Sequence, residues 1–407
     1  MAQRTRSGSL VAAASLAVAA LVLGGCTTHA PAAPESAAAP ATTPPTTAPP
    51  GASPTGGGAS ASSGSTPLDP LRPSASTPAQ RAVDKAVADA LLDRFEDPAL
   101  ASLASALVIV DGRTVLEHET GAPGAYHHTW SVTKSVVATL IGLAIEDGSL
   151  TGLDQTLGEL LPDHRAQMSP EVRRVTLEQL LTMTAGFTDT GLLSDDAPDT
   201  VASLLAAHDG EVGQFAYSNA GAHLVAAVLA EATGRTVLDY AQERLFDPLG
   251  IPSDAALQLD LLMPASWGLF SASGFAWGTD HQGINSGAFG LRLRAQDMAR
   301  FGLMVLDGGR WEGRQVVPAG WVRAMTTTHV RTGSDRTPGY GYEWWIGDAD
   351  GQRTIAALGL GGQVIAIVPS RDIVAVFQTE TMPTDSADIG DALLAAIQTV
   401  IVPAYAP

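Results

Sequence analysis

The sequence predicts an α+β fold in which an antiparallel sheet, flanked by terminal helices, carries an inserted all-α lobe. Two strand-like segments lie early in the folded part, at residues 104–110 and 114–117. A run of four further strands occupies residues 340–379, and a helix follows it. The long segment between the two groups has helical patterns. Strands from both ends of the domain therefore meet in one sheet, and the helical middle forms the lobe.

The first residues have the composition of a targeting segment. Arg4 and Arg6 precede an apolar run at residues 9–23, which is short for a membrane-spanning helix. The letters LGGC at residues 23–26 resemble a lipobox, where bacterial lipoproteins are cleaved and lipidated. We expect a lipoprotein signal peptide over residues 1–25. An ordinary signal peptide or a short membrane anchor is the alternative.

Cys26 is the only cysteine of the chain, so an internal disulfide and a metal site built from cysteines are excluded. Lipidation of Cys26 would anchor the exported protein to the outer face of the bacterial cytoplasmic membrane. Residues 26–78 consist mainly of Ala, Pro, Thr, Ser and Gly, and we expect a disordered tether there. Residues 79–407 then form the folded domain, with the helical lobe at roughly residues 130–335.

The charge of the chain limits its partners. It has 23 basic and 42 acidic side chains and a formal net charge of −19. Such a chain repels the phosphates of nucleic acids and anionic lipid headgroups, so neither is an expected binding partner. No protein partner is predicted.

Glycines and turn residues mark the ends of the expected elements. A helix at residues 78–95 places Val83, Val87 and Leu91 on one stripe, and Asp111-Gly112 is a hairpin signal between the first two strands. Further helices are expected at residues 131–147, 176–185, 219–233, 236–245, 296–306 and 385–402, most of them followed by glycine. The late strands are expected at residues 340–346, 354–358, 363–368 and 373–379.

The letters WSVTKS at residues 130–135 begin an apolar helix, which places Ser131 and Lys134 about one turn apart on the same face. A serine hydroxyl needs a proton acceptor to act as a nucleophile, and a lysine amine serves when it is neutral part of the time. Chance alone produces such a pair about once in a chain of this length. However, the chain has only two lysines, Lys85 and Lys134, and Lys134 lies beside an apolar run where an unpaired ammonium is costly.

A second motif, FAYSNAG at residues 215–221, lies just before another expected helix. Tyr217 and Asn219 fall on the same side of a short turn there. A phenolate near a cation can accept the proton of a serine and return it to a leaving group, and an amide can hold both a substrate carbonyl and an amine. The alternative is a core tyrosine followed by a helix-capping Ser or Asn.

A third motif consists of Gly361, Gly362 and Gln363, which lead into an apolar strand. Glycines at the start of a core strand often mark a close approach between the backbone and a ligand. An N–H group here would complete an oxyanion hole with the N–H of Ser131. The alternative is a plain cluster of turn glycines.

These three motifs, in this order, resemble those of the serine β-lactamase and penicillin-binding protein family. The similarity is greatest to its class C-like branch, which includes esterases, D-aminopeptidases, D-alanyl-D-alanine carboxypeptidases and short-amide hydrolases. Further phrases typical of the family lie at residues 175–187, 245–251 and 287–302. The resemblance extends over about residues 100–400 and implies the transpeptidase-like fold of that family.

The resemblance also implies a role for each motif. Ser131 would be the nucleophile that becomes acylated, and Lys134 and Tyr217 would share the acid and base work. Asn219 would position Lys134 and the substrate carbonyl. Neither a metal nor an organic cofactor is needed for such acyl transfer.

In the third motif, Gly361, Gly362 and Gln363 would bind the substrate, and the Gln363 N–H would belong to the oxyanion hole. The family's version of this motif usually opens with Lys or His, which meets a substrate carboxylate. Leu360 occupies that position here. An apolar residue suits a neutral ester, an amide, or a substrate whose charge is bound elsewhere.

The sequence therefore favours a cell-surface serine hydrolase that acts on small esters or amides. A β-lactamase is an alternative, and so is a D-alanyl-D-alanine carboxypeptidase acting on peptidoglycan-like substrates. The alternative from another class is a lipoprotein of the same fold that binds cell-wall fragments without turnover. The intact set of motif residues argues against a pure binding protein.

Other residues near the motifs are weaker candidates. His127 and His128 precede the nucleophile, and we expect supporting or solvated positions rather than a catalytic role. The nine histidines show no metal-ligand spacing. A long segment with weak periodicity holds further candidates for a substrate pocket or a loop core, namely Trp267, Phe270, Phe275, Trp277, Asp280 and His281.

Overall fold

The computed structural model describes residues 76–188, 197–253, 256–263, 266–380 and 386–405. The expected signal peptide, the lipidation site Cys26 and the tether up to residue 75 lie outside the described residues. Asp385, the first residue of the last helix expected from the sequence, also lies outside them.

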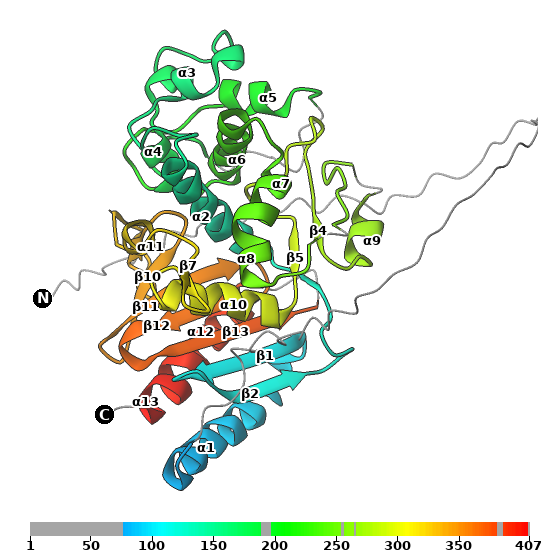
Figure 1. Ribbon diagram of the computed structural model, residues 1–407, viewed down its shortest axis with the longest axis vertical. Helices are drawn as coiled ribbons and strands as arrows, with labels where there is room; N and C mark the ends of the chain where they lie inside the picture. The colour runs from blue at the N-terminus through cyan, green and yellow to red at the C-terminus, as the bar shows by residue number, and fades with distance from the viewer. Residues whose placement is uncertain (1–75, 189–196, 254–255, 264–265, 381–385, 406–407) are drawn as a thin grey trace, which may run out of the picture. The chain divides into compact units, whose positions relative to one another are not determined.

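One antiparallel sheet of eight strands organises the domain, in the order β2-β1-β13-β12-β11-β10-β9-β8 (Figure 1). Because β1 pairs with β13, the beginning and the end of the domain meet in adjacent strands, and the predicted α+β fold is confirmed. The strands are β1 (Leu103–Val110), β2 (Arg113–Glu119), β8 (Val330–Arg331), β9 (Gly339–Tyr340), β10 (Trp345–Ala349), β11 (Gln352–Gly359), β12 (Gln363–Val368) and β13 (Ile373–Thr379).

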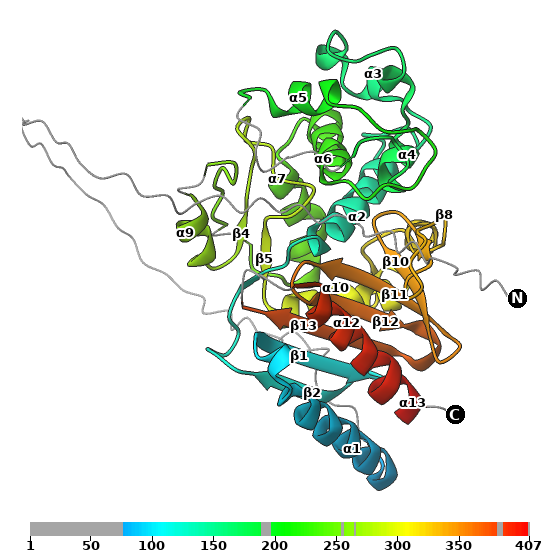
Figure 2. The same ribbon diagram turned by 180° about the vertical axis from the view of Figure 1, so that it is seen from behind.

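Each face of this sheet has its own hydrophobic core. On one face the terminal helices α1 (Pro78–Phe95), α12 (Ser386–Ala396) and α13 (Val402–Ala404) pack over strand residues such as Phe377 (Figure 2). On the other face α10 (Ala295–Leu306) crosses β12 and β13, and the helical lobe lies beyond it. Burial from both sides explains why β12 and β13 are mainly apolar and are buried along their whole length.

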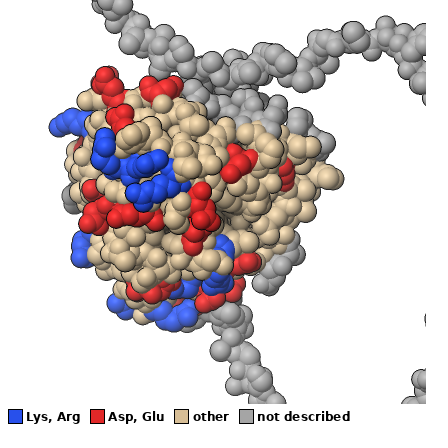
Figure 3. Space-filling view, turned by 90° about the horizontal axis from the view of Figure 1, so that it is seen from above, with Lys and Arg blue, Asp and Glu red and all other residues tan. Residues whose placement is uncertain are grey.

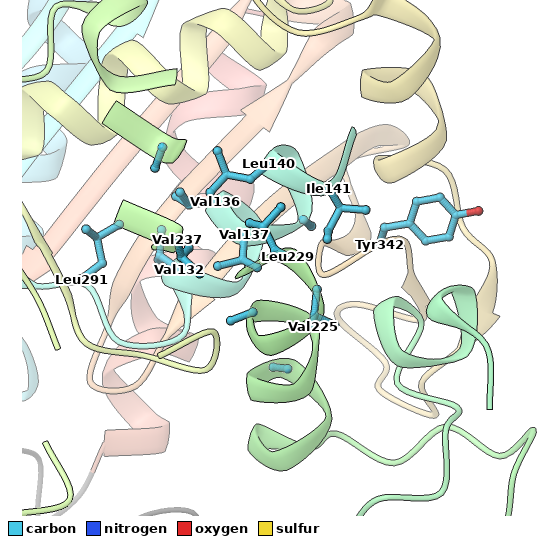
Figure 4. Close-up of a cluster of buried hydrophobic side chains, with 14 of the residues drawn as sticks. Val132, Val136, Val137, Leu140, Ile141, Val225, Leu229, Val237, Leu291 and Tyr342 are labelled. Atoms are coloured by element: carbon cyan, nitrogen blue, oxygen red, sulfur yellow. The ribbon is translucent and has the colours of Figure 1, made fainter. Parts of the chain in front are cut away.

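The helical lobe is built around α2 (Val132–Glu146), which is buried on every side until its last turn. A helix that is apolar all round needs neighbours all round. α6 (Asn219–Thr233) is one of them, and Figure 4 shows Val136 and Val137 of α2 in one apolar cluster with Leu229 of α6. The other helices are α3 (Leu157–Leu160), α4 (Leu177–Leu181), α5 (Thr200–Ala206), α7 (Val237–Ala241), α8 (Asp247–Leu249), α9 (Ser266–Ser271) and α11 (Ala319–Met325).

Two small sheets complete the described part of the fold. β3 (His127–His128), β5 (Leu291–Leu293) and β4 (Ala276–Trp277) form a three-stranded sheet, and β3 directly precedes α2 in the chain. β6 (Arg310–Trp311) pairs with β7 (Arg314–Gln315).

Most of the predicted helix ends coincide with the structure because a local backbone conformation fixes them. α6 covers the predicted residues, and Gly234 follows it in the left-handed conformation with φ 64°. The helix predicted over residues 176–185 is the shorter α4, although its capping box at Thr176 is present. The prediction of one strand over residues 340–346 is wrong: β9 and β10 are separated by a turn in which Glu343 has φ 59°.

Within the described ranges, none of the helices is both long enough and apolar enough to cross a membrane. Acidic and basic side chains are intermixed on the face shown in Figure 3. That face has no uniformly basic surface of the kind that binds nucleic-acid phosphates.

Gly142 allows α2 and α11 to touch. A Cβ atom on Gly142 would overlap the ring of Trp321, whose Nε1 donates a hydrogen bond to the Ala138 carbonyl at 3.0 Å. Because no side chain fits there, we expect Gly142→Ala to lower the free energy of unfolding by ~1–3 kcal/mol, the usual effect of overpacking a core. Urea-induced unfolding of the variant and the wild type measures the difference.

Gly390→Ala is the matched control for this change. Gly390 lies within α12, and nothing in the described structure comes near its missing side chain. Alanine there should raise stability by ~0.5–1 kcal/mol, because it limits the unfolded chain more than glycine does. Equal effects of the two substitutions would contradict the close contact between α2 and α11.

Candidate active site

The predicted nucleophile lies just before α2, where the backbone bends sharply. Trp130 has φ 48°, an unusual value for a residue other than glycine. The bend is held on both sides: Thr129 donates from N and Oγ1 to the Leu291 carbonyl, and Thr133 Oγ1 donates to the Trp130 carbonyl at 2.7 Å. The Ser131 hydroxyl makes no capping hydrogen bond with the helix. It is therefore available for chemistry at a position that the strained backbone fixes.

Lys134 joins three separate segments of the chain. It is 1% exposed, and its Nζ contacts Asn219 Oδ1 at 2.7 Å, the Ala288 carbonyl at 2.8 Å and Ser131 Oγ at 3.2 Å. The first two oxygens act as acceptors, so each takes one N–H of the amine. A neutral amine then has its lone pair left for the Ser131 hydroxyl, whereas an ammonium donates its third proton to the same oxygen.

Tyr217 and Asn219 flank the residue that caps α6. Ser218 Oγ accepts a hydrogen bond from the Gly221 N–H at 2.9 Å, so the cap fixes the start of this helix. The residues on either side of the cap are fixed with it. The predicted alternative, a capping residue after a tyrosine, is thus correct for Ser218 and leaves Asn219 to contact Lys134.

The Tyr217 ring lies beside the amine. Its centroid is 4.9 Å from Lys134 Nζ, which is a cation–π distance, and the ring stacks on Trp345 with 5.5 Å between centroids. The structure therefore brings together four of the predicted site residues, Ser131, Lys134, Tyr217 and Asn219.

A buried hydrogen-bonded pair supports the loop that carries the Ala288 carbonyl. His223 Nε2 lies 3.0 Å from Asp280 Oδ2, and neither side chain is more than 2% exposed. The other ring nitrogen, Nδ1, accepts from the Gly287 N–H at 3.4 Å. Because Nδ1 accepts this hydrogen bond, Nε2 is the ring nitrogen that donates to Asp280. Asp280 is therefore a supporting residue within the protein rather than a substrate ligand.

His281 likewise contacts an acid within the protein, since its Nδ1 lies 2.5 Å from Asp260 Oδ2. Among the described residues, no three or more His, Cys, Asp or Glu side chains are grouped so that they could hold a metal ion.

The structure does not bring Gly361, Gly362 and Gln363 to the nucleophile. All three are buried, and a Cβ atom on Gly362 would meet Ile389 of α12, on the opposite face of the sheet. The Gln363 side chain donates to the carbonyl and the hydroxyl of Thr379. The sequence predicted these residues at the site. In the structure Gly362 instead faces the side of the sheet that α12 covers.

Gly359, the last residue of β11, is the strand residue that approaches the nucleophile. A Cβ atom on Gly359 would overlap the Thr129 carbonyl oxygen and lie 3.1 Å from Trp130 Cβ. Strand residues alternate between faces, so Ala357 precedes Gly359 on the same face. The expected position of a carboxylate-binding cation is thus the fully buried Ala357 rather than Leu360. Since both are apolar, the end of β11 near Ser131 still supplies no charge.

His128 supports Trp130 within the protein. The two rings stack with 4.1 Å between centroids, and His128 Nε2 accepts from the Gly290 N–H at 3.0 Å. Burial, together with the nearby Arg292 guanidinium, lowers the pKa of His128 to about 3. Burial also lowers the pKa of His127. Both contacts of the His128 ring are thus made by the neutral form, which fits the expected supporting role.

The aromatic candidates divide into two groups. Trp267 and Phe270 lie beside Trp130 and His128, whereas Phe275 and Trp277 pack against Phe246 in the core. Trp267 and Trp130 line a cavity of about 530 Å³. The expectation of a substrate pocket therefore fits Trp267 and the alternative of a loop core fits Trp277.

Comparison with known proteins places this geometry in a family. A profile of the family described as Beta-lactamase matches residues 92–399, which is most of the described domain. The chain belongs to the β-lactamase family. This family consists of serine hydrolases and their penicillin-binding relatives, in agreement with the resemblance of the motifs.

Relatives of this β-lactamase-family protein are named for different substrates. It is 25% identical over 281 residues to the 6-aminohexanoate-dimer hydrolase of Paenarthrobacter ureafaciens, a match that covers 63% of this chain and 66% of that protein. The chain thus spans just under two thirds of that relative's length. It is 27% identical over 269 residues to penicillin-binding protein 4 of Amycolatopsis lactamdurans, covering 61% and 70% of the two chains.

The fold is also that of a class C β-lactamase from Rhodobacter sphaeroides. The two structures superpose with a TM-score of 0.57 at 19% sequence identity, over 80% of this chain and 99% of the other. This similarity confirms the predicted transpeptidase-like fold.

A buried acid, Glu343, lies behind the site of this β-lactamase-family protein. It is 3% exposed, Tyr340 OH donates to its Oε2 at 3.0 Å, and its Oε1 has no hydrogen-bond partner among the described residues. Its carbonyl accepts from Ser135 Oγ at 2.6 Å, which connects it to α2. Burial raises the pKa of the Glu343 carboxyl to about 8, and the charge of Lys134 lowers it only in part.

Sequence reasoning missed three contributors to the site. The Ala288 carbonyl gave no signal, because every residue has a carbonyl group. Gly359 did give a signal, since it is the first glycine of its cluster and directly ends an alternating strand. Glu343 gave one too, as the only acid within an aromatic stretch at residues 340–345.

Glu343→Gln is expected to stabilise the protein more at high pH than at low pH. With its pKa raised from 4.5 to about 8, Glu343 holds a proton in the folded protein that the unfolded chain releases. The wild type therefore loses stability as pH rises through this range, whereas glutamine does not titrate. The Tm advantage of the variant should be several degrees larger at pH 9 than at pH 5, as measured by thermal unfolding.

Glu312→Gln is the control, because Glu312 also has a left-handed backbone, with φ 47°, but is exposed. Its Tm difference from the wild type should stay the same at both pH values. A pH-independent effect of Glu343→Gln would contradict the buried proton.

Proposed function

We propose that the protein is a serine hydrolase that forms an acyl-enzyme on Ser131 and cleaves small esters or amides. The observation that carries this proposal is the set of contacts made by Lys134. Asn219 Oδ1 at 2.7 Å and the Ala288 carbonyl at 2.8 Å occupy two directions around Nζ and leave the third for Ser131. Burying an amine is costly, and a pure binding protein gains nothing from aiming it at a serine.

Acylation begins with a proton transfer. Neutral Lys134 accepts the hydroxyl proton of Ser131 while Oγ attacks the carbonyl carbon of the substrate, which becomes tetrahedral and carries an oxyanion. Tyr217, whose ring centroid is 4.9 Å from Nζ, passes its hydroxyl proton to the leaving alcohol or amine and takes the proton held by Lys134, so both groups return to their starting forms. The bond to the leaving group then breaks, and the acyl group stays on Oγ as an ester.

Deacylation repeats these steps with water as the nucleophile. Water gives a proton to the same Lys134 and Tyr217 pair and attacks the acyl carbon. The Oγ–carbonyl bond breaks, the Ser131 hydroxyl regains its proton, and the carboxylic acid leaves. Every proton in this cycle is carried by a side chain of the protein or by water.

The oxyanion hole of this proposal consists of the Ser131 N–H and the N–H of Leu360 at the end of β11. Its support is the close approach of Gly359 to Thr129 and Trp130, which a Cβ atom would prevent. Donors fixed before the reaction stabilise the developing charge without having to reorient, which is the main catalytic contribution of such holes.

Small esters and amides suit the site better than β-lactams, because Ala357 and Leu360 offer no cation on β11 to a carboxylate near the reacting carbonyl. The relative named as a 6-aminohexanoate-dimer hydrolase supports an amide substrate. A D-alanyl-D-alanine carboxypeptidase is the second candidate, supported by the similarity to penicillin-binding protein 4.

The location of the enzyme is a separate proposal, which rests on the sequence of residues 1–26. We infer that it is exported, cleaved before Cys26 and held by a lipid at the outer face of the cytoplasmic membrane. Metabolic labelling with palmitate should mark the wild type and not Cys26→Ser. Equal labelling of both would contradict the anchor.

Ser131→Ala tests the proposed nucleophile. The wild type should hydrolyse p-nitrophenyl acetate and butyrate, and Ser131→Ala should lower kcat by at least roughly 1000-fold, because no other group can form the acyl ester. Mass spectrometry after rapid acid quenching should find an acyl adduct on the wild type only. Nitrocefin should be hydrolysed far more slowly than either ester.

Ser149→Ala is the control, since Ser149 is an exposed serine beyond the end of α2. It should leave ester hydrolysis unchanged. Equal activity of Ser131→Ala and the wild type would overturn the assignment of the nucleophile. Absence of both turnover and adduct in the wild type would instead favour the binding protein for cell-wall fragments.

A further inference from the structure

The cavity of about 530 Å³ beside the nucleophile has largely aromatic walls and one buried cation. Trp130, which directly precedes Ser131, forms part of the wall, and Tyr126 and Trp267 line it as well. The link between this cavity and the proposed nucleophile is therefore Trp130, which adjoins Ser131 in the chain. The cation in its wall is Arg292.

Arg292 points into this wall because of its position in β5. Its neighbours Leu291 and Leu293 are fully buried in the core, and residues of a strand alternate between faces. β5 pairs with β3 on one side and β4 on the other, so the backbone at Arg292 is fixed from both sides. The side chain is 7% exposed.

The charge of Arg292 has no counter-ion in the described structure. Its guanidinium donates one hydrogen bond, from Nη2 to the Tyr126 carbonyl, and lies 5.6 Å from the Phe270 ring. Its Nε is buried and has no acceptor among the described residues. No described carboxylate lies within ion-pair distance of it, and burial lowers its pKa to about 10. A guanidinium has five N–H donors, and that of Arg292 makes one hydrogen bond to the described residues. It can therefore donate further hydrogen bonds to a ligand.

Arg113 shows how the same fold treats a buried arginine with a structural role. Arg113 is 5% exposed and forms ion pairs with Asp84 at 3.3 Å and Asp111 at 3.0 Å. Burying a charge without such partners is strongly unfavourable. The contrast indicates that the partner of Arg292 is a molecule that enters the cavity.

We propose that this cavity is a carboxylate subsite, in which Arg292 binds a carboxylate carried by the substrate several bonds away from the carbonyl that Ser131 attacks. The inference rests on the proposed hydrolase function and adds the substrate class. That class comprises esters or amides with one free carboxylate at the end of a short apolar chain or on an aromatic ring.

The lining of the cavity fits this ligand. Aromatic rings contact a methylene chain or an aryl group, and a guanidinium binds a carboxylate through paired hydrogen bonds. His127 and His128 have lowered pKa values and add no positive charge at neutral pH. Glu380 also lines the cavity, but its side chain is exposed and forms no ion pair with Arg292 among the described contacts. A substrate carboxylate can therefore bind Arg292 without displacing Glu380.

The subsite also accounts for the missing cation on β11. Ala357 cannot bind a carboxylate close to the reacting carbonyl, and Arg292 offers that function from β5, on the other side of Trp130. The substrate's charge is thus expected further from the reacting carbonyl than a cation on β11 would allow.

Three esters test the subsite by kinetics. p-Nitrophenyl butyrate is neutral, mono-p-nitrophenyl glutarate carries the carboxylate on the acyl group, and 5-butyryloxy-2-nitrobenzoate carries it on the leaving group. Arg292→Gln should lower kcat/KM roughly 10- to 100-fold for at least one carboxylate ester, mainly through KM, because it loses charge-assisted hydrogen bonds. It should change the neutral ester less than threefold.

Two further variants complete the kinetic test. Arg292→Lys keeps the charge but loses the paired hydrogen bonds, so it should restore part of the lost activity. Arg331→Gln removes the same charge from an exposed position and should change no ester. An equal loss for all three esters in Arg292→Gln, or no loss for any, would overturn the subsite and show that Arg292 only supports the fold.

Ligand binding separates a failure of the subsite from a failure of the hydrolase. Glutarate should raise the Tm of the wild type and of Ser131→Ala but not that of Arg292→Gln, and chloride at equal ionic strength should raise none. This result would support the subsite even if no ester were cleaved. Ester cleavage that depends on Ser131, without protection by glutarate and without an effect of Arg292→Gln, would leave the hydrolase and refute the subsite.

Discussion

The amine of Lys134 is the interaction on which the arrangement of the site depends. A buried amine is tolerated only when its hydrogens are bonded, and its partners come from α2, from the first residue of α6 and from the loop before β5. The lobe helices and the small sheet must therefore be correctly placed at the same time. The cap by Ser218 and the His223–Asp280 pair fix two of these partners in turn, so the precision of the site extends into the core.

The backbone contributes as much to the site as the side chains do. Trp130 is held at φ 48° by hydrogen bonds from Thr129 and Thr133, and stacking on His128 adds to them. Such strain persists only where the surroundings over-determine it. Gly359 then lets β11 approach this bend more closely than any other residue would allow. Sheet and lobe meet at this bend, directly before Ser131, the proposed nucleophile.

Local chemistry could be predicted from the sequence, and long-range register could not. Ser131 and Lys134, or Tyr217 and Asn219, are two or three residues apart, so their juxtaposition follows from local geometry. The glycine cluster is different, because a shift of a single residue moves a group to the other face of the sheet. The register at the end of β11 decides that Gly359 approaches Thr129 and Trp130. The Ala288 carbonyl depends on a contact across 154 residues and has no local signature.

Lys134 and the cation that binds a substrate carboxylate differ in how strictly the structure fixes their positions. Lys134 is constrained by partners in three segments, so its position tolerates little change. A cation that binds a substrate carboxylate needs only to lie at the right distance from the reacting carbonyl, and different elements can supply it. In this chain β11 offers the apolar Ala357, while β5 offers Arg292 without a counter-ion among the described residues. A β-lactam holds its carboxylate at a fixed distance from its reactive carbonyl and cannot use both positions. Under the proposed function, moving the cation from one strand to another would change the substrate class and leave the proposed acyl-transfer residues untouched.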